Sequence, residues 1–171
     1  MTSPYAIEAL ADRHDRKPFS CGIEELDRYL ASQATQDVRR RVATCFVAAE
    51  TGGAKILAYY TLAATSFPLV DITPEMAKKL PRYPLVPAIR IGRLAVSSSV
   101  QGSGFGSSLL FDAMTRSVSS EIMAFAVVVD ATNDAAAAFY RHNKFLPFNN
   151  APMSLYLPLA DFARTYPPAA K

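Results

Sequence analysis

The chain has 171 residues, of which 50% are hydrophobic and 19% are charged, and its formal net charge at pH 7 is +3. That length suits one domain that buries roughly 70% of its extended surface, and the composition excludes a disordered chain. No apolar run reaches the ~18 residues of a membrane-spanning helix, and the N-terminus lacks the features of a secretory signal. We therefore expect a single soluble domain over residues 1–171, located in the cytoplasm.

Cysteine and histidine are scarce, with two of each in the chain. Two cysteines cannot build the disulfide framework of a small secreted protein or a four-cysteine zinc site. Cys21 and Cys45 are therefore expected to be packing residues in the interior, and His14 and His142 to lie at the surface. No metal is expected.

The first half of the chain predicts one helix, a hairpin and a short second helix. Residues 22–34 carry apolar side chains at helical spacing, with two glutamates in the first turn, where the helix dipole favours negative charge. Residues 44–49 (TCFVAA) and 55–64 (KILAYYTLAA) predict two antiparallel strands around a two-glycine turn. Thr73 and the proline after it predict a helix start, and Pro81 ends that helix.

The second half predicts alternating strands and helices. The expected elements are a strand over 88–96, a helix over 104–119, a strand over 124–129, a helix over 133–141 and a strand over 154–157. Residues 124–129 (AFAVVV) have too few polar positions for a half-exposed strand, which predicts burial on both faces. Residues 165–171 are expected to fray. These elements predict an α/β (α+β) fold with a partly parallel sheet.

A glycine-rich segment leads directly into the predicted helix at 104–119. It runs from Gln101 to Ser107 (QGSGFGS). Glycines let the backbone approach an anion, and the free N–H groups at a helix start favour one, although a flexible turn has the same pattern. A P-loop would need a lysine after Gly106, and a dinucleotide fold would place the motif after its first strand. The pyrophosphate of an acyl-CoA is the best remaining ligand.

Two segments resemble the signatures of the GNAT acetyltransferases. Gln101-x-x-Gly104-x-Gly106 matches their Gln/Arg-x-x-Gly-x-Gly/Ala motif, and residues 133–140 (NDAAAAFY) with Phe145 resemble their last signature helix. The similarity is closer to the GNAT toxins of type II toxin–antitoxin modules and spans roughly residues 19–159. The segments that recur in that subgroup are 19–22 (FSCG), 26–30 (LDRYL), 36–37 (QD), 59–62 (YYTL), 80–84 (LPRYP) and 91–96 (IGRLAV).

The resemblance implies a fold, a donor and partners. The GNAT fold has a mixed, mostly antiparallel central sheet that is splayed at the acetyl-CoA site and flanked by helices. Acetyl-CoA is the implied acetyl donor, held here between the strands at 94–96 and 124–129. Toxins of this group acetylate the α-amine of aminoacyl-tRNA, block translation and are neutralised by a ribbon-helix-helix antitoxin. A homodimer is also implied.

The resemblance also implies residue roles. Tyr140 is the implied general acid for the departing CoA thiolate, and a phenol with a pKa near 10 is protonated at pH 7, although its spacing alone indicates a core aromatic. The residues implied to bind the cofactor are Leu94, Ala95, Val96, Gln101, Gly102, Ser103, Gly104, Phe105, Gly106, Ser107 and Asn133. Lys144 stands where the family has glycine, and a positive φ there would cost on the order of 1 kcal/mol.

The acceptor strand lacks a candidate base. Many related enzymes use a glutamate on a central strand, but residues 85–101 contain no Asp or Glu. An α-amine with a pKa near 7.8 is roughly 15% neutral at pH 7, whereas a lysine amine is only ~0.04% neutral. The missing carboxylate therefore points to an α-amine as the acceptor, although an acid elsewhere in the fold could serve.

Basic residues gather in two stretches without acids, 38–49 and 76–93. By composition alone a solvated face is favoured, because neither stretch has a recognised nucleic-acid motif or an evident alternation of basic and aromatic residues. The resemblance makes them candidates for contacting tRNA phosphates or the antitoxin. The candidate contacts are Arg39, Arg40, Lys78, Arg82, Arg90 and Arg93.

Two other functions stay open from the sequence. The first is an acetyltransferase for a small amine or a protein N-terminus, which would share the cofactor residues and differ only at the acceptor side. The second is a module without catalysis that binds acyl-CoA or an antitoxin.

Overall fold

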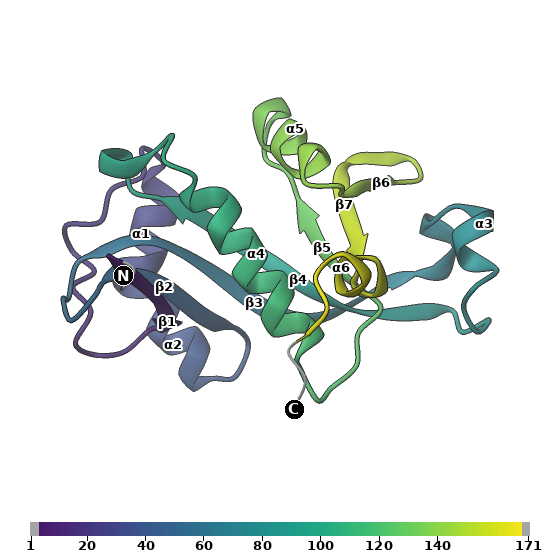
Figure 1. Cartoon of the computed structure of the whole chain (residues 1–171), viewed down its shortest axis with the longest axis horizontal. Helices are drawn as coiled ribbons and strands as arrows, with labels where there is room; N and C mark the ends of the chain where they lie inside the picture. Colours follow the sequence, from purple (N-terminus) through teal and green to yellow (C-terminus); the bar gives the residue numbers. More distant parts are fainter. Residues whose placement is uncertain (1–3, 169–171) are drawn as a thin grey trace. The chain divides into compact units, whose positions relative to one another are not determined.

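The computed structural model of the chain describes residues 4–168 (Figure 1). In this part of the chain, strands form a sheet in the order β1-β2-β3-β4-β5-β7-β6. The strands are β1 (Tyr5–Ala9), β2 (Thr44–Glu50), β3 (Ile56–Pro68), β4 (Leu85–Val96), β5 (Ala126–Asp130), β6 (Leu146–Phe148) and β7 (Ala151–Pro158). The helices are α1 (Glu24–Ser32), α2 (Ala34–Arg39), α3 (Pro74–Ala77), α4 (Phe105–Val118), α5 (Asp134–His142) and α6 (Leu159–Thr165), with 3-10 turns η1 (Leu69–Asp71) and η2 (Ser98–Val100).

The chain divides into two compact units. Unit 1 comprises the residues up to 63 together with 91–113, and unit 2 comprises 64–90 together with the residues from 114 onward. The β1–β2, β2–β3, β5–β7 and β6–β7 pairs are antiparallel. This confirms the predicted mixed α/β fold with a mostly antiparallel sheet.

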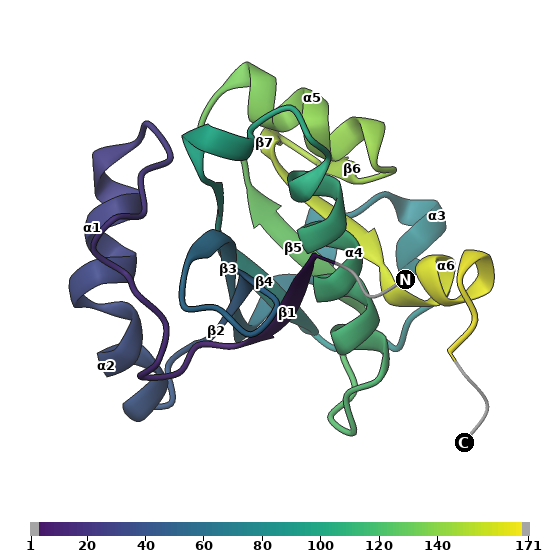
Figure 2. The same ribbon diagram turned by 60° about the vertical axis from the view of Figure 1, so that its left-hand side comes forward.

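In unit 1, alternation along β2 and β3 sends side chains to two opposite layers. Val47 is paired with Tyr59, and both belong to the core cluster that α1 contributes to through Leu30. One register step away, Phe46 is paired with Tyr60, and their rings are 5.3 Å apart. The Tyr60 hydroxyl donates to Asp112 of α4 over 2.6 Å. Strand period two therefore places α1 and α4 on opposite faces of this part of the sheet (Figure 2).

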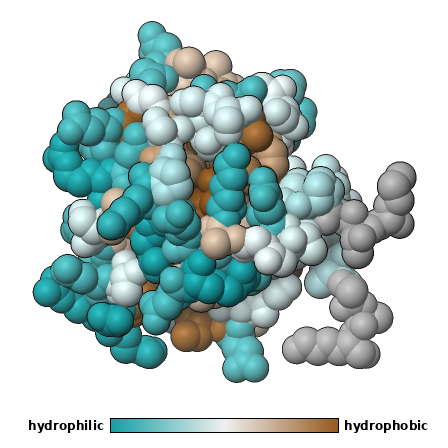
Figure 3. All heavy atoms as spheres, turned by 90° about the vertical axis from the view of Figure 1, so that its left-hand side faces the viewer, coloured by the Kyte–Doolittle hydropathy of each residue, from teal (hydrophilic) through white to brown (hydrophobic). Residues whose placement is uncertain are grey.

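The side of the molecule that carries α1 and α2 is mostly hydrophilic. Figure 3 shows polar side chains over most of this face, with small apolar patches between them.

The two free cysteines, Cys21 and Cys45, are buried in the core of unit 1, as expected for packing residues. Burial raises the pKa of the Cys45 thiol to about 12, so the thiolate that a nucleophile needs is disfavoured at neutral pH.

In unit 2, β5 and β7 pair as antiparallel strands of the sheet. Val128 lies opposite Tyr156 and belongs to the same core cluster as Phe67 and Phe148. Phe67 packs against Phe148 with ring centroids 5.1 Å apart. The other face of β5 is also closed to solvent, because Val127, which points to that face, is fully buried. Burial on both faces was the prediction for this strand, and it is confirmed.

The main predicted elements are confirmed, with boundary shifts. Four elements were missed: β1, α2, β6 and α6. The expected fraying at 165–171 falls partly on Thr165, which is helical, and partly on residues 169–171, which lie outside the described residues. Among residues 4–168, no helix is long and apolar enough to span a bilayer, and no cluster of His, Cys, Asp or Glu could hold a metal ion.

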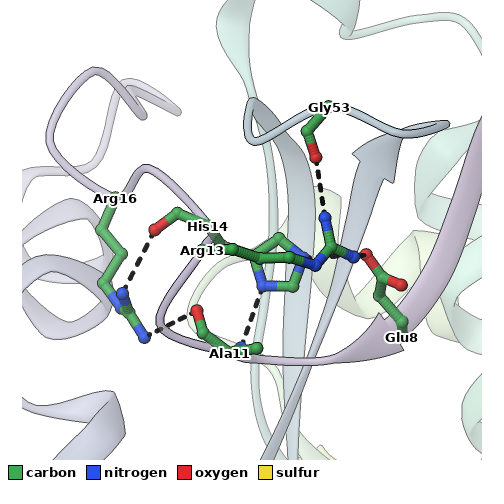
Figure 4. Close-up of polar contacts among 6 residues, drawn as sticks. All are labelled: Glu8, Ala11, Arg13, His14, Arg16 and Gly53. Atoms are coloured by element: carbon green, nitrogen blue, oxygen red, sulfur yellow. Dashed lines mark hydrogen bonds and ion pairs between the residues drawn. The ribbon is translucent and has the colours of Figure 1, made fainter.

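His14 corrects the expectation of a surface residue, because its side chain is fully buried (Figure 4). The amide N–H of Ala11 donates to its Nδ1 over 2.9 Å, so the other ring nitrogen, Nε2, carries the proton and faces Glu8 at 2.8 Å. Arg13 also pairs with Glu8 and donates to the carbonyl of Gly53 over 2.9 Å. The hydrogen bond from His14, followed by the Arg13 contacts, lowers the pKa of Glu8. These contacts fasten the segment after β1 to the β2–β3 turn.

Candidate active site

Hydrogen bonds to residues near in sequence and in space hold the end of β4 in unit 1. Ala95 is buried, and the amide N–H of Ser97 donates to the carbonyl of Leu57 over 2.8 Å. The side-chain amide of Gln101 donates to the carbonyls of Val96 and Cys21, over 3.0 and 2.9 Å. Gln101 therefore uses its NH₂ group to anchor the start of the glycine-rich segment 101–107, the glycine loop.

Gly92 and Thr61 form a close contact that the sequence did not single out. A Cβ at Gly92 would lie 3.1 Å from Thr61 Oγ1, and that oxygen accepts a hydrogen bond from the amide of Arg93 over 3.1 Å. The pair holds β4 just before Leu94. The signal in the sequence is a glycine inside a strand pattern, which marks a close backbone approach.

The glycine loop has a backbone conformation that needs glycine. Gly102 and Gly104 have φ of +82° and +86°, and a Cβ at either position would have no neighbour within 4 Å. The space beside both residues is therefore open, and only glycine adopts this conformation without strain. Residues 97–111 contain no acid, so no carboxylate of the loop would repel an anion.

The start of α4 supplies hydrogen-bond donors next to this open space. Ser108 makes the first bond of the helix by donating to the carbonyl of Gly104 over 3.1 Å. The preceding amides, of Phe105, Gly106 and Ser107, have no partner within the helix. The Phe105 ring packs on Tyr5 with centroids 4.6 Å apart, which directs the side chain away to β1. Free amides, an open cradle and a helix dipole fit a pyrophosphate group.

In unit 2, Asn133 caps α5. Its Oδ1 accepts from the amide of Ala136 over 2.8 Å, so this oxygen satisfies one free N–H of the helix start. The side chain is exposed. The capping role accounts for the asparagine in the signature segment without a cofactor.

Tyr140 lies on α5 with its ring packed and its hydroxyl unpartnered. Its side chain is buried between Phe139 and Phe145, at centroid distances of 5.2 and 5.4 Å. Within the described part of the chain its hydroxyl has no hydrogen-bond partner, and it is not among the fully shielded polar atoms. Burial raises the pKa of Tyr140 to about 12, so the phenol is a protonated donor at neutral pH.

The turn after α5 contains Lys144, the residue that departs from the family pattern. Lys144 has φ of +74°, the left-handed conformation expected of the glycine it replaces. The amides of Lys144 and Phe145 donate to the carbonyls of Arg141 and Tyr140, over 3.0 and 3.1 Å. These two bonds form a Schellman motif, which ends the helix and turns Phe145 onto Tyr140.

The six basic candidates fall into two groups. Arg90 pairs with Asp130 in unit 2, and the guanidinium of Arg93 lies 3.6 Å from the centre of the Tyr29 ring in unit 1. Both are thus engaged within the protein. The exposed candidates are Arg39 and Arg40 at the end of α2, and Lys78 and Arg82 after α3.

Comparison with known proteins decides the family. Residues 7–145 match the model of the Acetyltransferase (GNAT) family. The chain belongs to the GNAT acetyltransferases. It is therefore an acyltransferase that uses acetyl-CoA as donor, as the family resemblance implied.

Several GNAT proteins resemble the chain over nearly its whole length. It is 34% identical to the tRNA-acetylating toxin of Mycobacterium tuberculosis (strain ATCC 25618 / H37Rv), over 94% of this chain and 96% of that protein. Among solved structures, AtaT complexed with acetyl-methionyl-tRNAfMet has a TM-score of 0.89 at 27% identity, covering 95% of this chain and 99% of that one. AtaTR bound with acetyl-CoA has a TM-score of 0.83 at 26% identity, covering 95% and 98%.

Proposed function

We propose that this GNAT protein is a toxin that acetylates the α-amino group of aminoacyl-tRNA and thereby blocks translation. The observation that carries the proposal is the 34% identity to a tRNA-acetylating toxin over 94% of the chain. The likeness to AtaT with its acetylated tRNA supports the same acceptor. The absence of any carboxylate in 85–101 agrees with it, because an α-amine that is partly neutral at pH 7 needs less help from a base.

The residue roles that we propose are supported by the geometry of each unit. Acetyl-CoA supplies the acetyl group as an activated thioester. The amides of Phe105, Gly106 and Ser107 would hold its pyrophosphate, with Gly102 and Gly104 leaving room for it. Leu94, Ala95 and Val96 would offer backbone groups to its pantetheine arm.

Tyr140 is the proposed general acid. Its ring is packed among aromatic side chains, its hydroxyl has no hydrogen-bond partner within residues 4–168, and it would donate its proton to the leaving sulfur. A phenol can protonate a thiolate whose conjugate acid has a pKa near 8.5 only if it is itself protonated, and burial keeps it so.

The partners and setting are proposed on the same basis. A mutant AtaT toxin bound to the C-terminus of the antitoxin AtaR is among the similar structures, at a TM-score of 0.82 and 25% identity. We extend antitoxin binding to this chain, with an antitoxin of the ribbon-helix-helix type, a homodimeric state and a cytoplasmic location where charged tRNA is found. The whole chain would act as one catalytic domain.

The test uses radiolabelled acetyl-CoA with bulk charged tRNA and, in parallel, with the same tRNA deacylated beforehand. We expect label on the charged tRNA alone, released with the amino acid when the ester is hydrolysed. Label on neither tRNA, together with turnover of a polyamine or peptide, would refute the proposal in favour of a small-amine or N-terminal acetyltransferase. No turnover with any amine, despite acetyl-CoA binding, would indicate a binding module.

A further inference from the structure

The excursion between β3 and β4 in unit 2 is rich in basic residues and carries an exposed aromatic ring. It contains η1, α3 and the segment 78–84 (KKLPRYP) (Figure 1). The amide of Leu69 donates to the carbonyl of Pro84 over 3.0 Å, which closes the excursion at its base. Asn149, in the β6–β7 turn, donates from its backbone amide to the carbonyl of Asp71 over 2.8 Å and from its side chain to that of Ile72 over 2.9 Å.

Tyr83 directly precedes Pro84 at the base of this excursion, and its ring lies in solvent. It is 69% exposed, the largest exposed fraction of any aromatic side chain among residues 4–168. No hydrogen bond or ring contact engages it within that range. Leu80 packs against the core of unit 2, so the segment is anchored on one side, and Pro81 and Pro84 restrict the backbone around Tyr83. The backbone that carries the ring is therefore already restricted before a ligand binds.

Three cations lie within five positions of this ring in the sequence. Lys78, Lys79 and Arg82 are exposed, and within the described residues none of the three forms an ion pair. Residues 74–84 hold these three cations against one carboxylate, Glu75. An exposed aromatic flanked by unpaired cations is the combination that binds single-stranded nucleic acid, through base stacking and phosphate contacts.

We propose that Tyr83 is a stacking platform for a base in the single-stranded 3′ end of the tRNA substrate, with Arg82 and the two lysines on the flanking phosphates. This rests on the proposed function, because the single-stranded acceptor end carries the amino acid to be acetylated. Tyr83 is thus a positioning residue for the acceptor substrate. Sequence composition alone assigned this stretch to a solvated face.

Two exposed apolar side chains, Val70 in η1 and Leu85 at the start of β4, would suit a protein partner. The two lysines favour a nucleic acid, because lysine is depleted in protein interfaces, whereas Lys78 and Lys79 lie within five positions of this ring. The end of a nucleic acid offers a base that can stack on the ring and phosphates that can bind the cations.

The experiment compares kcat/KM for three acceptors: aminoacyl-tRNA, the same aminoacyl group on a CCA trinucleotide, and its methyl ester. Tyr83→Ala is expected to lower kcat/KM for both nucleotide acceptors by roughly 5- to 150-fold relative to the ester, the range expected for one stacked base. Tyr83→Phe keeps the ring and should stay within about twofold of wild type. Tyr166→Ala, at another exposed tyrosine of unit 2, is the control and should leave all three unchanged. Melting temperature and acetyl-CoA affinity check folding.

Binding of deacylated tRNA, followed by fluorescence anisotropy, tests Tyr83 without any acetylation. Weaker binding by Tyr83→Ala but not by Tyr83→Phe supports the platform even if wild type fails to acetylate charged tRNA, an outcome that would refute the proposed function alone. Equal binding and equal kcat/KM ratios in wild type and Tyr83→Ala overturn the inference. Those equalities together with lost binding of the antitoxin would assign the surface to a protein partner instead.

Discussion

The amide of Phe145 donates to the carbonyl of Tyr140 over 3.1 Å, while the two rings lie with centroids 5.4 Å apart. One helix ending therefore positions the proposed acid and the ring that packs against it. The residue between them in the turn, Lys144, is the one that departs from the family pattern, and its φ of +74° shows that the left-handed turn is kept without glycine.

Lys144→Gly should stabilise the protein. A left-handed conformation costs a residue with a Cβ about 1–2 kcal/mol, and the greater freedom of glycine in the unfolded chain offsets part of that gain. We expect an increase of about 0.5–1 kcal/mol in the free energy of unfolding, measured by urea denaturation. Lys144→Ala removes the same charge but keeps the Cβ and should show no such gain. An equal gain in both variants would assign the effect to charge rather than to backbone strain.

Tyr140→Phe should abolish most of the activity while preserving the fold. The variant keeps the ring contacts with Phe139 and Phe145 and loses only the hydroxyl that would protonate the leaving sulfur. Loss of a general acid lowers kcat by about 10²- to 10⁴-fold. Acetyl-CoA affinity, measured by calorimetry, should change little. Full activity of the purified variant would remove Tyr140 from the proposed role.

The raised pKa of Tyr140 predicts where its proton is lost. The folded-state pKa of about 12 exceeds the unfolded value of about 10, so the unfolded chain ionises first, and the stability linked to this group falls as pH rises from about 10 to 12. Below about pH 10 the acid stays protonated. Single-turnover rates, measured by rapid quench to outrun ester hydrolysis, should therefore show no decline from Tyr140 between about pH 8 and 10. Ionisation of the Tyr140 phenol near pH 9, seen by ultraviolet difference against Tyr140→Phe, would contradict this.

Gly104→Ala tests the glycine loop. Its φ of +86° strains any residue with a Cβ, yet nothing lies within 4 Å, so the cost comes from the backbone and not from a clash. If the loop relaxes to relieve about 1 kcal/mol of strain, acetyl-CoA affinity should fall about fivefold. Gly52→Ala is the matched control, because φ there is +72° with the same open surroundings, in the β2–β3 turn. A similar loss of affinity in both variants would refute a specific role of the loop.

Salt should separate an RNA acceptor from a small amine. Each neutralised phosphate releases counterions, so kcat/KM for aminoacyl-tRNA should fall steeply as salt rises from about 50 to 200 mM. The aminoacyl methyl ester has no phosphate and provides the baseline for any effect of salt on the enzyme and on acetyl-CoA. Parallel salt slopes for the two acceptors would mean that the exposed cations, such as Lys78 and Arg82, do not contact the tRNA.

The sequence by itself determined the elements whose signal is local. Period and composition predicted α4 and β5, and Thr73 followed by a proline predicted the start of α3. The glycine signature located the start of α4 with its free amides. The family resemblance raised a positive φ at Lys144 as one possibility, and the structure shows a φ of +74° there. Backbone conformation at these points depends on steric and hydrogen-bonding preferences within a few residues, which the order of residues contains.

Tertiary structure decided what depends on neighbours far along the chain. Strand β1 has five residues and gains its pairing from β2, and His14 is buried by contacts that its own composition does not reveal. Arg93 lies against Tyr29, whereas Tyr83 is left in solvent. Burial and charge pairing are set by which elements cover a residue after folding, so only the assembled units distinguish engaged arginines from an aromatic ring available to a ligand.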